Sequence, residues 1–314
     1  ISEAHHPGLR SAAAVKEPLT CGQLRKFIRS FDLRCFGLSQ FDVLCAMLPN
    51  SAEAAVCFLA AASHCIYAPL DPDLSQMATV LSALGAHSII ELADRREAVT
   101  GTAVLQMMCD AKTDGLFTLH GDKRRCGLQP PPRQTNVALA LHSSGATGKP
   151  KSVQFTHANL GHGIQQVAFA VDRQPHDVCA IVMPLFHLHS LVACVGVAMY
   201  SGSSVICPAF ASPRHLMTAT TWYSAVPTVH LSIAAAEAKA LAHNVSIVRN
   251  CSAVLLPNVI DCLRRLFETA VIVPTFATIE AYPVTANPID LEVRLTSVGV
   301  AAGPAVHILN GMAQ

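Results

Sequence analysis

The sequence predicts an α/β protein built from layered, parallel-rich sheets that are flanked by helices. Three observations predict this class. The chain has 314 residues, enough for two domains of about 150 residues each or for one larger α/β unit. Short β-type apolar runs alternate with apolar residues at helical spacing, and helices are the crossovers that parallel strands require. Hydrophobic residues make up 51% of the chain and charged residues 14%, which excludes a disordered chain.

The first unit begins with a helix whose start is marked by Thr20. A threonine hydroxyl can cap a helix, and the apolar residues that follow, through Phe31, have helical spacing. Strands and helices then alternate along the chain. The expected elements are a strand over 42–48, a helix over 51–63, a strand over 66–70, a short helix over 76–84 and a strand over 87–92.

A polar, proline-rich connector over 121–134 separates this unit from the next. We therefore expect one α/β subdomain over 1–130, a second over 131–290, and the start of a truncated β subdomain over 291–314. An alanine-rich segment over 234–242 is typical of a helix. The strands expected in the second subdomain lie over 136–141, 152–155, 178–183, 203–207, 222–226, 252–256 and 271–274.

Charge and apolar patterning exclude some classes of partner. The 22 Lys and Arg residues nearly balance the 21 Asp and Glu residues, so nucleic acid is not an expected partner. The most apolar stretches are 178–213, which prolines and glycines interrupt, and 54–70, which is typical of a buried helix running into a strand. We therefore expect no transmembrane span. The N-terminal residues have neither a basic leader nor an apolar core, so no secretory signal is expected.

The cysteines and histidines form no metal-binding pattern. The 12 cysteines include no C-x-x-C pair, and the 15 histidines include no H-E-x-x-H spacing. Most of the cysteines lie in apolar runs, where a free thiol packs as a small hydrophobe. We expect a reducing intracellular compartment, whether cytosol, peroxisome or organelle interior.

The segment LHSSGATGKPKSV over 141–153 has the composition of a polyphosphate-binding loop. Its glycines let the backbone N–H groups approach an anion, its hydroxyls donate further hydrogen bonds, and its lysines add positive charge. It is not a Walker A loop, because only two residues separate its glycines and a proline follows the first lysine. The alternative is a solvated hairpin turn. The candidate phosphate-binding residues are Ser143, Ser144, Gly145, Thr147, Gly148, Lys149 and Lys151.

This loop and other segments, in the same order, resemble the adenylate-forming (AMP-binding) superfamily, which includes acyl-CoA synthetases, luciferases and peptide-synthetase adenylation domains. The resemblance covers roughly residues 20 to 310. The matching segments are Gly37 with FDV (41–43), LPN (48–50), APLDP (68–72), MPLFH (183–187), AVPT (225–228), FATIEA (276–281) and SVG (297–299). The phrases WYSAVPT (222–228) and RNCS (249–252) look most like relatives of oxalate-CoA ligase.

The resemblance implies an acid–thiol ligase of the acyl-CoA synthetase type, which uses ATP, magnesium and CoA. A carboxylic acid would first form an acyl-adenylate, from which the CoA thiol then displaces AMP. Glu280 would ligate magnesium and is the first implied catalytic residue. His187, the second, would border the acyl pocket together with the Trp222 region. The segment 252–255 would line the adenine, and the implied cofactor-binding residues outside the loop are Ser252, Ala253, Phe276 and Thr278.

The sequence departs from the family pattern where the chemistry would occur. Ile279 stands where the family has a threonine that touches the α-phosphate. Other departures are Phe276 for tyrosine, Ser152 and Ser190 for glycine, and Val254 in the adenine segment. The ribose motif, the hinge and the C-terminal lid with its catalytic lysine find no match, so only the N-terminal domain is expected. Without a lid, this chain alone is expected to release no acyl-CoA.

Two functional hypotheses therefore stay open. One is a carboxylate–CoA ligase that is inactive or incomplete as this chain. The other is a catalytically silent homologue, an acyl-CoA synthetase-like subunit with a structural role in a larger assembly. The low charge predicts exposed apolar surface, so a protein partner is expected, in addition to a small carboxylic acid if the chain is active.

Overall fold

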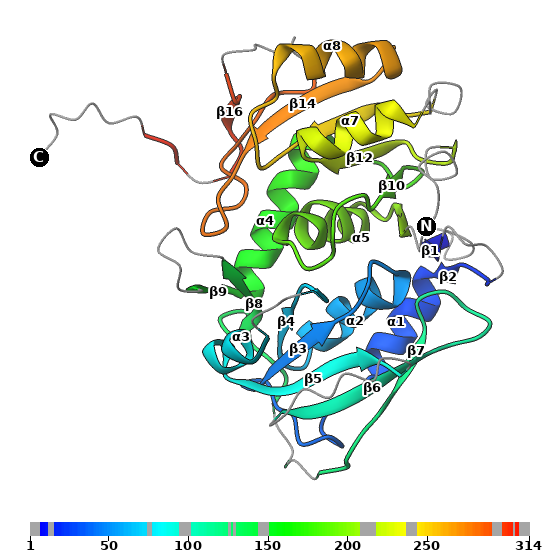
Figure 1. The fold of residues 1–314 in the computed structure, drawn as a ribbon, viewed down its shortest axis with the longest axis vertical. Helices are drawn as coiled ribbons and strands as arrows, with labels where there is room; N and C mark the ends of the chain where they lie inside the picture. The colour runs from blue at the N-terminus through cyan, green and yellow to red at the C-terminus, as the bar shows by residue number, and fades with distance from the viewer. Residues whose placement is uncertain are drawn as a thin grey trace, which may run out of the picture.

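The computed structural model describes residues 7–11, 16–73, 77–93, 102–124, 127, 130–143, 151–207, 218–236, 244–290, 297–303 and 305–307. These residues form two sheets that are mostly parallel, and helices pack on their faces. Figure 1 shows one sheet below the other, with helix α4 (His157–Val171) rising from the lower sheet along the upper one. The α/β class with parallel-rich sheets is confirmed.

The first sheet has seven strands in the order β7-β6-β5-β3-β4-β8-β9. All five residues of β3 are buried, as expected of a central parallel strand. Strands β7 and β9, at the two edges, pair antiparallel with β6 and β8. The bounds are β3 (Val43–Met47), β4 (Ile66–Pro69), β5 (Ala86–Leu92), β6 (Ala103–Cys109), β7 (Phe117–His120), β8 (Val137–Ser143) and β9 (Lys151–Thr156).

The helices of this half begin where the sequence predicts. The Thr20 hydroxyl accepts a hydrogen bond from the backbone N–H of Gln23 at 3.2 Å and caps α1 (Cys21–Ser30). Ser51 does the same for α2 (Ala52–Ala62), accepting from the N–H of Ala54 at 3.1 Å. Helix α3 (Met77–Leu84) follows β4. The structure adds β6 and β7, which the sequence analysis did not predict.

The second sheet has nine strands in the order β16-β15-β14-β13-β12-β10-β11-β1-β2, and its strands from β14 to β1 run parallel. The bounds are β1 (Pro7–Ser11), β2 (Leu19–Thr20), β10 (Val178–Ala180), β11 (Ser204–Cys207), β12 (Trp222–Ala225), β13 (Ile247–Asn250), β14 (Val271–Phe276), β15 (Thr285–Ala286) and β16 (Val300–Ala301).

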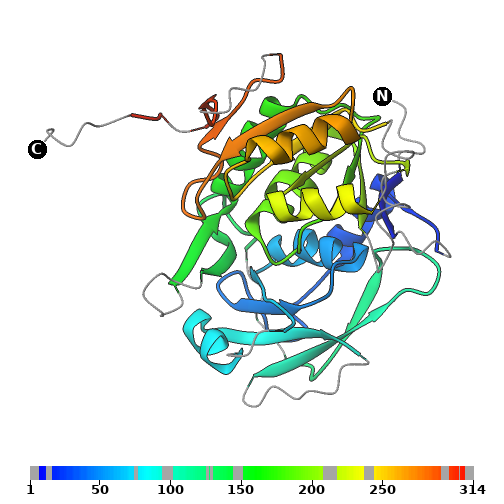
Figure 2. The same ribbon diagram turned by 45° about the horizontal axis from the view of Figure 1, so that its top comes forward.

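Alternate residues of these strands face opposite helix layers. Val248 and Ile272 share a core cluster with residues of α7 (Pro227–Ala235) and α8 (Pro257–Leu266), which lie side by side in Figure 2. Their neighbours Ile247 and Val273 belong to the other cluster, which includes residues of α4, π-helix η1 (Ser190–Gly196) and α5 (Val197–Ser201). That cluster also holds residues of the first sheet, so the two sheets share a core.

The strand expected over 252–256 is wrong. The strand ends at Asn250, and the next residues form a loop in which Ser252 has a φ of 62°. The apolar residues Val254 and Leu256 are 76% and 54% exposed, so they pack in no sheet. Pro257 then starts α8, in a position where its missing N–H leaves no helical hydrogen bond unmade. Of the helix expected over 234–242, only the end of α7 at Ala235 lies within the described residues.

The subdomain bounds 1–130, 131–290 and 291–314 stay a prediction. The division of the strands between the two sheets does not coincide with the boundary at residue 130. Strands β8 and β9 complete the first sheet although they follow residue 130, and β1 and β2 join the second sheet. Within the part of the chain that the structure describes, no helix is long and apolar enough to cross a membrane.

Candidate active site

A cavity of about 350 Å³ opens at the carboxyl ends of the parallel strands β10, β12, β13 and β14. In open parallel α/β sheets, this edge is where ligands bind. Each strand delivers residues from the loop that follows it. The lining residues are Met183, His187, Leu188, His189, Val226, Cys251, Ser252, Ala277, Thr278, Ile279 and Tyr282.

The loop after β10 is held in place from the other sheet. The Asn50 side chain, which follows β3, donates from Nδ2 to the Met183 carbonyl at 2.9 Å and accepts at Oδ1 from the Leu185 N–H at 2.7 Å. The Ser190 hydroxyl donates to the same Met183 carbonyl at 3.0 Å. Two sheets and one π-helix therefore fix the segment that carries His187 and His189, and π-helical turns of this kind are frequent at functional sites.

The cavity brings together three of the residues that the sequence predicts, His187, Ser252 and Thr278. Ser252 lies in the tight turn that follows β13. Thr278 follows β14, and its turn is closed by two hydrogen bonds with Ala281, one from backbone to backbone and one to the Thr278 hydroxyl, both 3.1 Å long. Ile279, which replaces the family threonine, also lines the cavity.

The other described candidates lie beside the cavity, and their assignments stay predictions. Phe276 ends β14 and is 47% exposed, while the Ala253 carbonyl accepts from Asn250 Nδ2 at 2.8 Å. Glu280 is exposed, so its carboxylate is free to meet a cation beside a bound polyphosphate. Among the described residues, no three His, Cys, Asp or Glu side chains form a cluster that could hold a metal by themselves.

The candidate phosphate loop spans the turn between β8 and β9. Ser143 ends β8 and pairs with Lys151, the exposed first residue of β9. His142 acts electrostatically on His187, so the base of this hairpin adjoins the cavity wall. Five candidates lie outside the described residues, namely Ser144, Gly145, Thr147, Gly148 and Lys149.

His187 stands on the cavity wall with its ring 4.5 Å from that of Phe186, centroid to centroid. Partial loss of water lowers the pKa of His187, and the nearby carboxylate of Asp71 opposes that shift. The imidazole is therefore neutral at pH 7. The Trp222 region was expected to border the acyl pocket. Val226 of that region lines the cavity, whereas Trp222 itself lies fully buried in the core.

Beneath the cavity lies a buried polar network that the sequence analysis did not single out. Arg249 of β13 is 1% exposed, and its Nη1 donates to His189 Nδ1 and Ser224 Oγ, each at 3.2 Å. Tyr282 joins through its hydroxyl, 3.4 Å from Nη1 and 3.2 Å from His189 Nδ1. An arginine that follows Ile247 and Val248 in a buried strand was the signal that could have revealed it.

This network fixes the tautomer of His189. A guanidinium nitrogen can only donate, so Nδ1 of His189 accepts and the ring proton sits on Nε2. Nε2 lies 3.4 Å from Cys251 Sγ and therefore donates to the sulfur, while the thiol donates to the Ala225 carbonyl at 3.4 Å.

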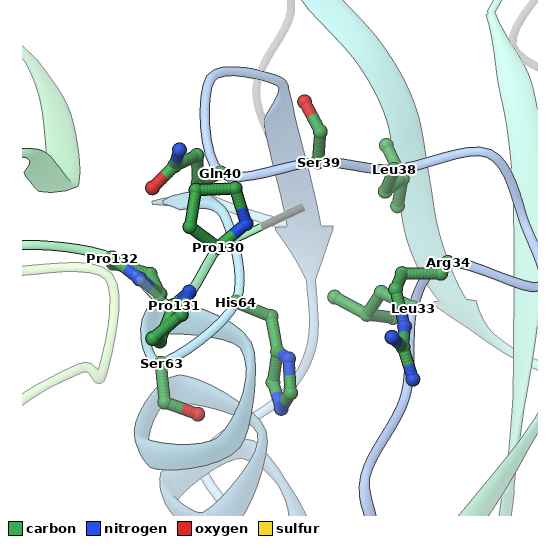
Figure 3. Close-up of a pocket in the computed structure, with 10 residues that line it drawn as sticks. All are labelled: Leu33, Arg34, Leu38, Ser39, Gln40, Ser63, His64, Pro130, Pro131 and Pro132. Atoms are coloured by element: carbon green, nitrogen blue, oxygen red, sulfur yellow. The ribbon is translucent and has the colours of Figure 1, made fainter. Parts of the chain in front are cut away.

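A second cavity, of about 270 Å³, lies in the half of the molecule that holds the first sheet. In Figure 3 its proline wall, Pro130 to Pro132, lies across from Leu33 and Arg34. Gln40 reaches it with a buried Oε1 that has no hydrogen-bond partner among the described residues. None of the candidate catalytic or cofactor-binding residues lines this cavity.

Comparison with known proteins agrees with the fold. Residues 4–312 match the family model of the AMP-binding enzymes. A probable CoA ligase, CCL9 of Humulus lupulus, is 28% identical over 88% of this chain, and the match spans 58% of that protein. Oxalate–CoA ligase of Arabidopsis thaliana is 32% identical over 55% of the chain and 36% of its own length. The structure of VinN with L-aspartate has a TM-score of 0.78 at 18% identity, covering 95% of this chain and 79% of VinN.

Proposed function

Since this chain belongs to the AMP-binding enzyme family, we propose that its pocket activates a small carboxylic acid as an acyl-adenylate at the expense of ATP. The observation that supports this most is the placement of the cavity. His187, Ser252 and Thr278 meet at the carboxyl edge of the second sheet, beside the base of the β8–β9 hairpin. The acid and the polyphosphate would therefore be bound from two sheets at once.

In the proposed reaction, an oxygen of the acid forms a bond to the α-phosphorus of ATP. Pyrophosphate leaves as the bond between the α-phosphorus and the oxygen that bridges to the β-phosphate breaks. The lysines and backbone N–H groups of the 143–151 segment would neutralise the polyphosphate. Magnesium, for which Glu280 offers an exposed carboxylate, would offset phosphate charge. His187, neutral at pH 7, would orient the acid without adding charge.

The acid is proposed to be small, because the cavity measures only about 350 Å³ and part of its opening would be occupied by the nucleotide. The relationship to an oxalate–CoA ligase supports a short acid, and transfer of the acyl group to the thiol of CoA would be the second step. The chain spans about half the length of the CoA ligase that it matches over most of its own length, so this second step is a proposal for the whole protein.

Calorimetry with ATP and magnesium tests the first step. The chain should bind ATP, and Lys151→Ala should weaken binding about tenfold, because it removes a charge at the end of the phosphate hairpin. Lys112→Ala removes an equally exposed lysine from a loop of the first sheet and should leave affinity unchanged. Unchanged ATP affinity in the Lys151 variant would show that the end of this hairpin does not contribute to the ATP site.

A second candidate is a catalytically silent subunit, and Ile279 favours it. A hydrocarbon side chain lines the cavity where a hydroxyl would contact the α-phosphate, and such donors contribute a few kcal/mol to transition-state stabilisation. Exposed apolar side chains such as Phe41 and Phe169, 63% and 64% exposed, fit an interacting subunit. Light scattering with and without ATP separates the two: nucleotide-independent assembly supports the subunit, and a monomer at high concentration opposes it.

A further inference from the structure

We propose that the 350 Å³ cavity accepts a short monocarboxylic acid whose tail is an uncharged hydrocarbon, and that it discriminates against dicarboxylic acids. The inference rests on the proposed function, because it names the substrate class of the same site. It goes beyond that function, which a dicarboxylic acid of the same length would satisfy equally well.

The lining of the cavity offers no partner for a second carboxylate. Within the part of the chain that the structure describes, no Lys, Arg, Asp or Glu side chain lines it. The carboxylate of Asp71 acts electrostatically on His187, so it adds negative charge beside this wall. A buried charge without a partner is unfavourable, and a dicarboxylic acid would bring such a charge into the cavity. The apolar lining residues are Met183, Leu188, Val226, Ala277 and Ile279.

The lining changes from polar at the exposed side to apolar in the depth. Ser252 and Thr278 are exposed, whereas Met183 and Leu188 are 8% and 6% exposed. The Thr278 hydroxyl accepts from the Ala281 N–H at 3.1 Å, so its own proton can be donated to an anion. The reacting carboxylate would therefore meet the two hydroxyls, and the tail of the acid would lie against Met183 and Leu188.

The polar groups at the base of the cavity are already bonded to one another. His189 accepts from Arg249 at Nδ1 and donates from Nε2 to Cys251 Sγ, at 3.2 and 3.4 Å. The Cys251 thiol donates to the Ala225 carbonyl at 3.4 Å, and the Tyr282 hydroxyl lies 3.2 Å from His189 Nδ1. A carboxylate at this base would have to break one of these bonds to gain a donor, whereas a methyl group would not.

Arg249 does not supply the missing cation. It is 1% exposed and is not among the described residues that line the cavity. Its Nη1 already donates to His189 and Ser224, each at 3.2 Å. Arginine recognises a carboxylate strongly when the two groups are in direct contact, often through two parallel hydrogen bonds. The neutral side chains of the wall prevent that contact here.

NMR titration of the full chain with isotope-labelled methionine methyl groups tests the proposal. Propanoate is paired with malonate, and butanoate with succinate, so that within each pair a terminal methyl group is replaced by a carboxylate. Met183 lines the cavity, and Met108, which is 51% exposed in β6, reports binding elsewhere. At neutral pH, the Met183 shifts should give at least tenfold tighter binding of butanoate than of succinate. From acetate to butanoate, affinity should rise about fourfold with each added CH₂.

Two results would overturn the proposal directly. One is succinate binding as tightly as butanoate or more tightly, and the other is no Met183 shift with any of the acids. Monomethyl succinate separates charge from size, because it is longer than succinate but carries a single carboxylate. It should bind more tightly than succinate. Binding as weak as that of succinate would mean that the cavity discriminates by length, which also contradicts the proposal.

A pair of variants at Val226 tests the role of charge in the wall. Val226 is half-buried and lines the cavity after β12. Val226→Lys adds an ammonium group whose hydrocarbon stem can lie along the apolar lining, so succinate affinity should rise at least tenfold. Val226→Met adds similar length without charge and should keep the preference for butanoate. No gain for succinate in a folded Lys variant would contradict the proposal, and if that variant unfolds, the wild-type preference decides.

The acid preference and the proposed adenylation can fail separately, because ATP binding is measured on its own by calorimetry. A preference for butanoate without ATP binding would retain the monocarboxylate pocket and reject the proposed function. ATP binding together with equal affinity for butanoate and succinate would do the reverse.

Discussion

Nη1 of Arg249 lies 3.2 Å from Nδ1 of His189, and this contact joins two segments that are 60 residues apart in the chain. Arg249 comes from β13, and His189 immediately precedes π-helix η1. The Tyr282 hydroxyl meets both residues from the loop after β14. The base of the cavity is therefore one hydrogen-bonded unit made by one strand and two loops, and a change in any of them should alter ligand binding.

Asn50→Ala should weaken ligand binding from a distance. The change removes the two hydrogen bonds to Met183 and Leu185 that hold the loop carrying His187. At about 1 kcal/mol for each hydrogen bond, we expect a loss of about 2 kcal/mol in the free energy of unfolding. ATP affinity should fall as well. Chemical denaturation and calorimetry measure the two quantities.

Asn136→Ala is the matched control for that change. Asn136 accepts from the Arg133 N–H at 2.6 Å in an exposed turn outside the cavity lining, so its loss should lower stability and leave ATP affinity intact. Equal ATP affinity in the wild-type chain and the Asn50 variant would mean that the loop carrying His187 keeps its conformation without the two hydrogen bonds from Asn50.

Two glycines of α4 should respond oppositely to alanine. At Gly163, a Cβ would lie 2.9 Å from the Tyr282 carbonyl oxygen, closer than real Cβ contacts. At Gly161, nothing lies within 4 Å. Alanine favours a helix interior over glycine by about 1 kcal/mol, so Gly161→Ala should raise the melting temperature. Gly163→Ala should lower it and disturb Tyr282 at the cavity. A stabilising effect at both positions would show that the loop holding Tyr282 moves away from the new Cβ at little cost in free energy.

The sequence predicted the capped helices and most strands because local signals decide them. Thr20 and Ser51 satisfy N–H groups a few residues away, whatever surrounds them. The strand expected over 252–256 failed because apolar residues such as Val254 face outward there, in a loop that tertiary contacts impose. Periodicity alone cannot show this.

The site was predictable only in its parts. His187, Ser252 and Thr278 belong to segments that the family resemblance marks, and the structure brings them to one cavity. The contact between Arg249 and His189 joins residues of two different segments. No local pattern specifies such a pair, since it depends on which strands are neighbours in the sheet. The order of β10, β12 and β13 supplies that information.

His230 should make stability depend on pH. Burial lowers its pKa from 6.5 to about 4, while the Tyr223 hydroxyl lies 3.0 Å from its Nδ1. Above pH 6.5, both the folded and the unfolded chain hold it neutral. Between pH 6.5 and 4 only the unfolded chain binds the proton, so stability is lost as the pH falls, by about 3 kcal/mol in total.

His230→Gln removes this titration and should flatten the loss of stability between pH 6.5 and 4, measured as the denaturation midpoint in urea. His176→Gln, a change at an exposed histidine, is the control for removing a histidine from the surface. An identical pH profile for the His230 variant and the wild-type chain would show that other groups dominate acid destabilisation.

Restoring a hydroxyl at Ile279 is the sharpest test of whether the cavity still serves nucleotide chemistry. Ile279 lines the cavity next to Thr278, and it is partly buried against the core. In Ile279→Thr, the new hydroxyl can donate to a phosphate oxygen, and at about 1 kcal/mol for a hydrogen bond we expect ATP affinity to rise about fivefold. Removing apolar contacts should lower stability by about 1 kcal/mol.

Ile289→Thr makes the same chemical change at another half-buried isoleucine outside this cavity, so it should lower stability without a gain in affinity. A gain confined to Ile279→Thr would indicate a nucleotide site that lost one donor, whereas no gain in either variant would indicate a pocket that no longer receives a phosphate at this position.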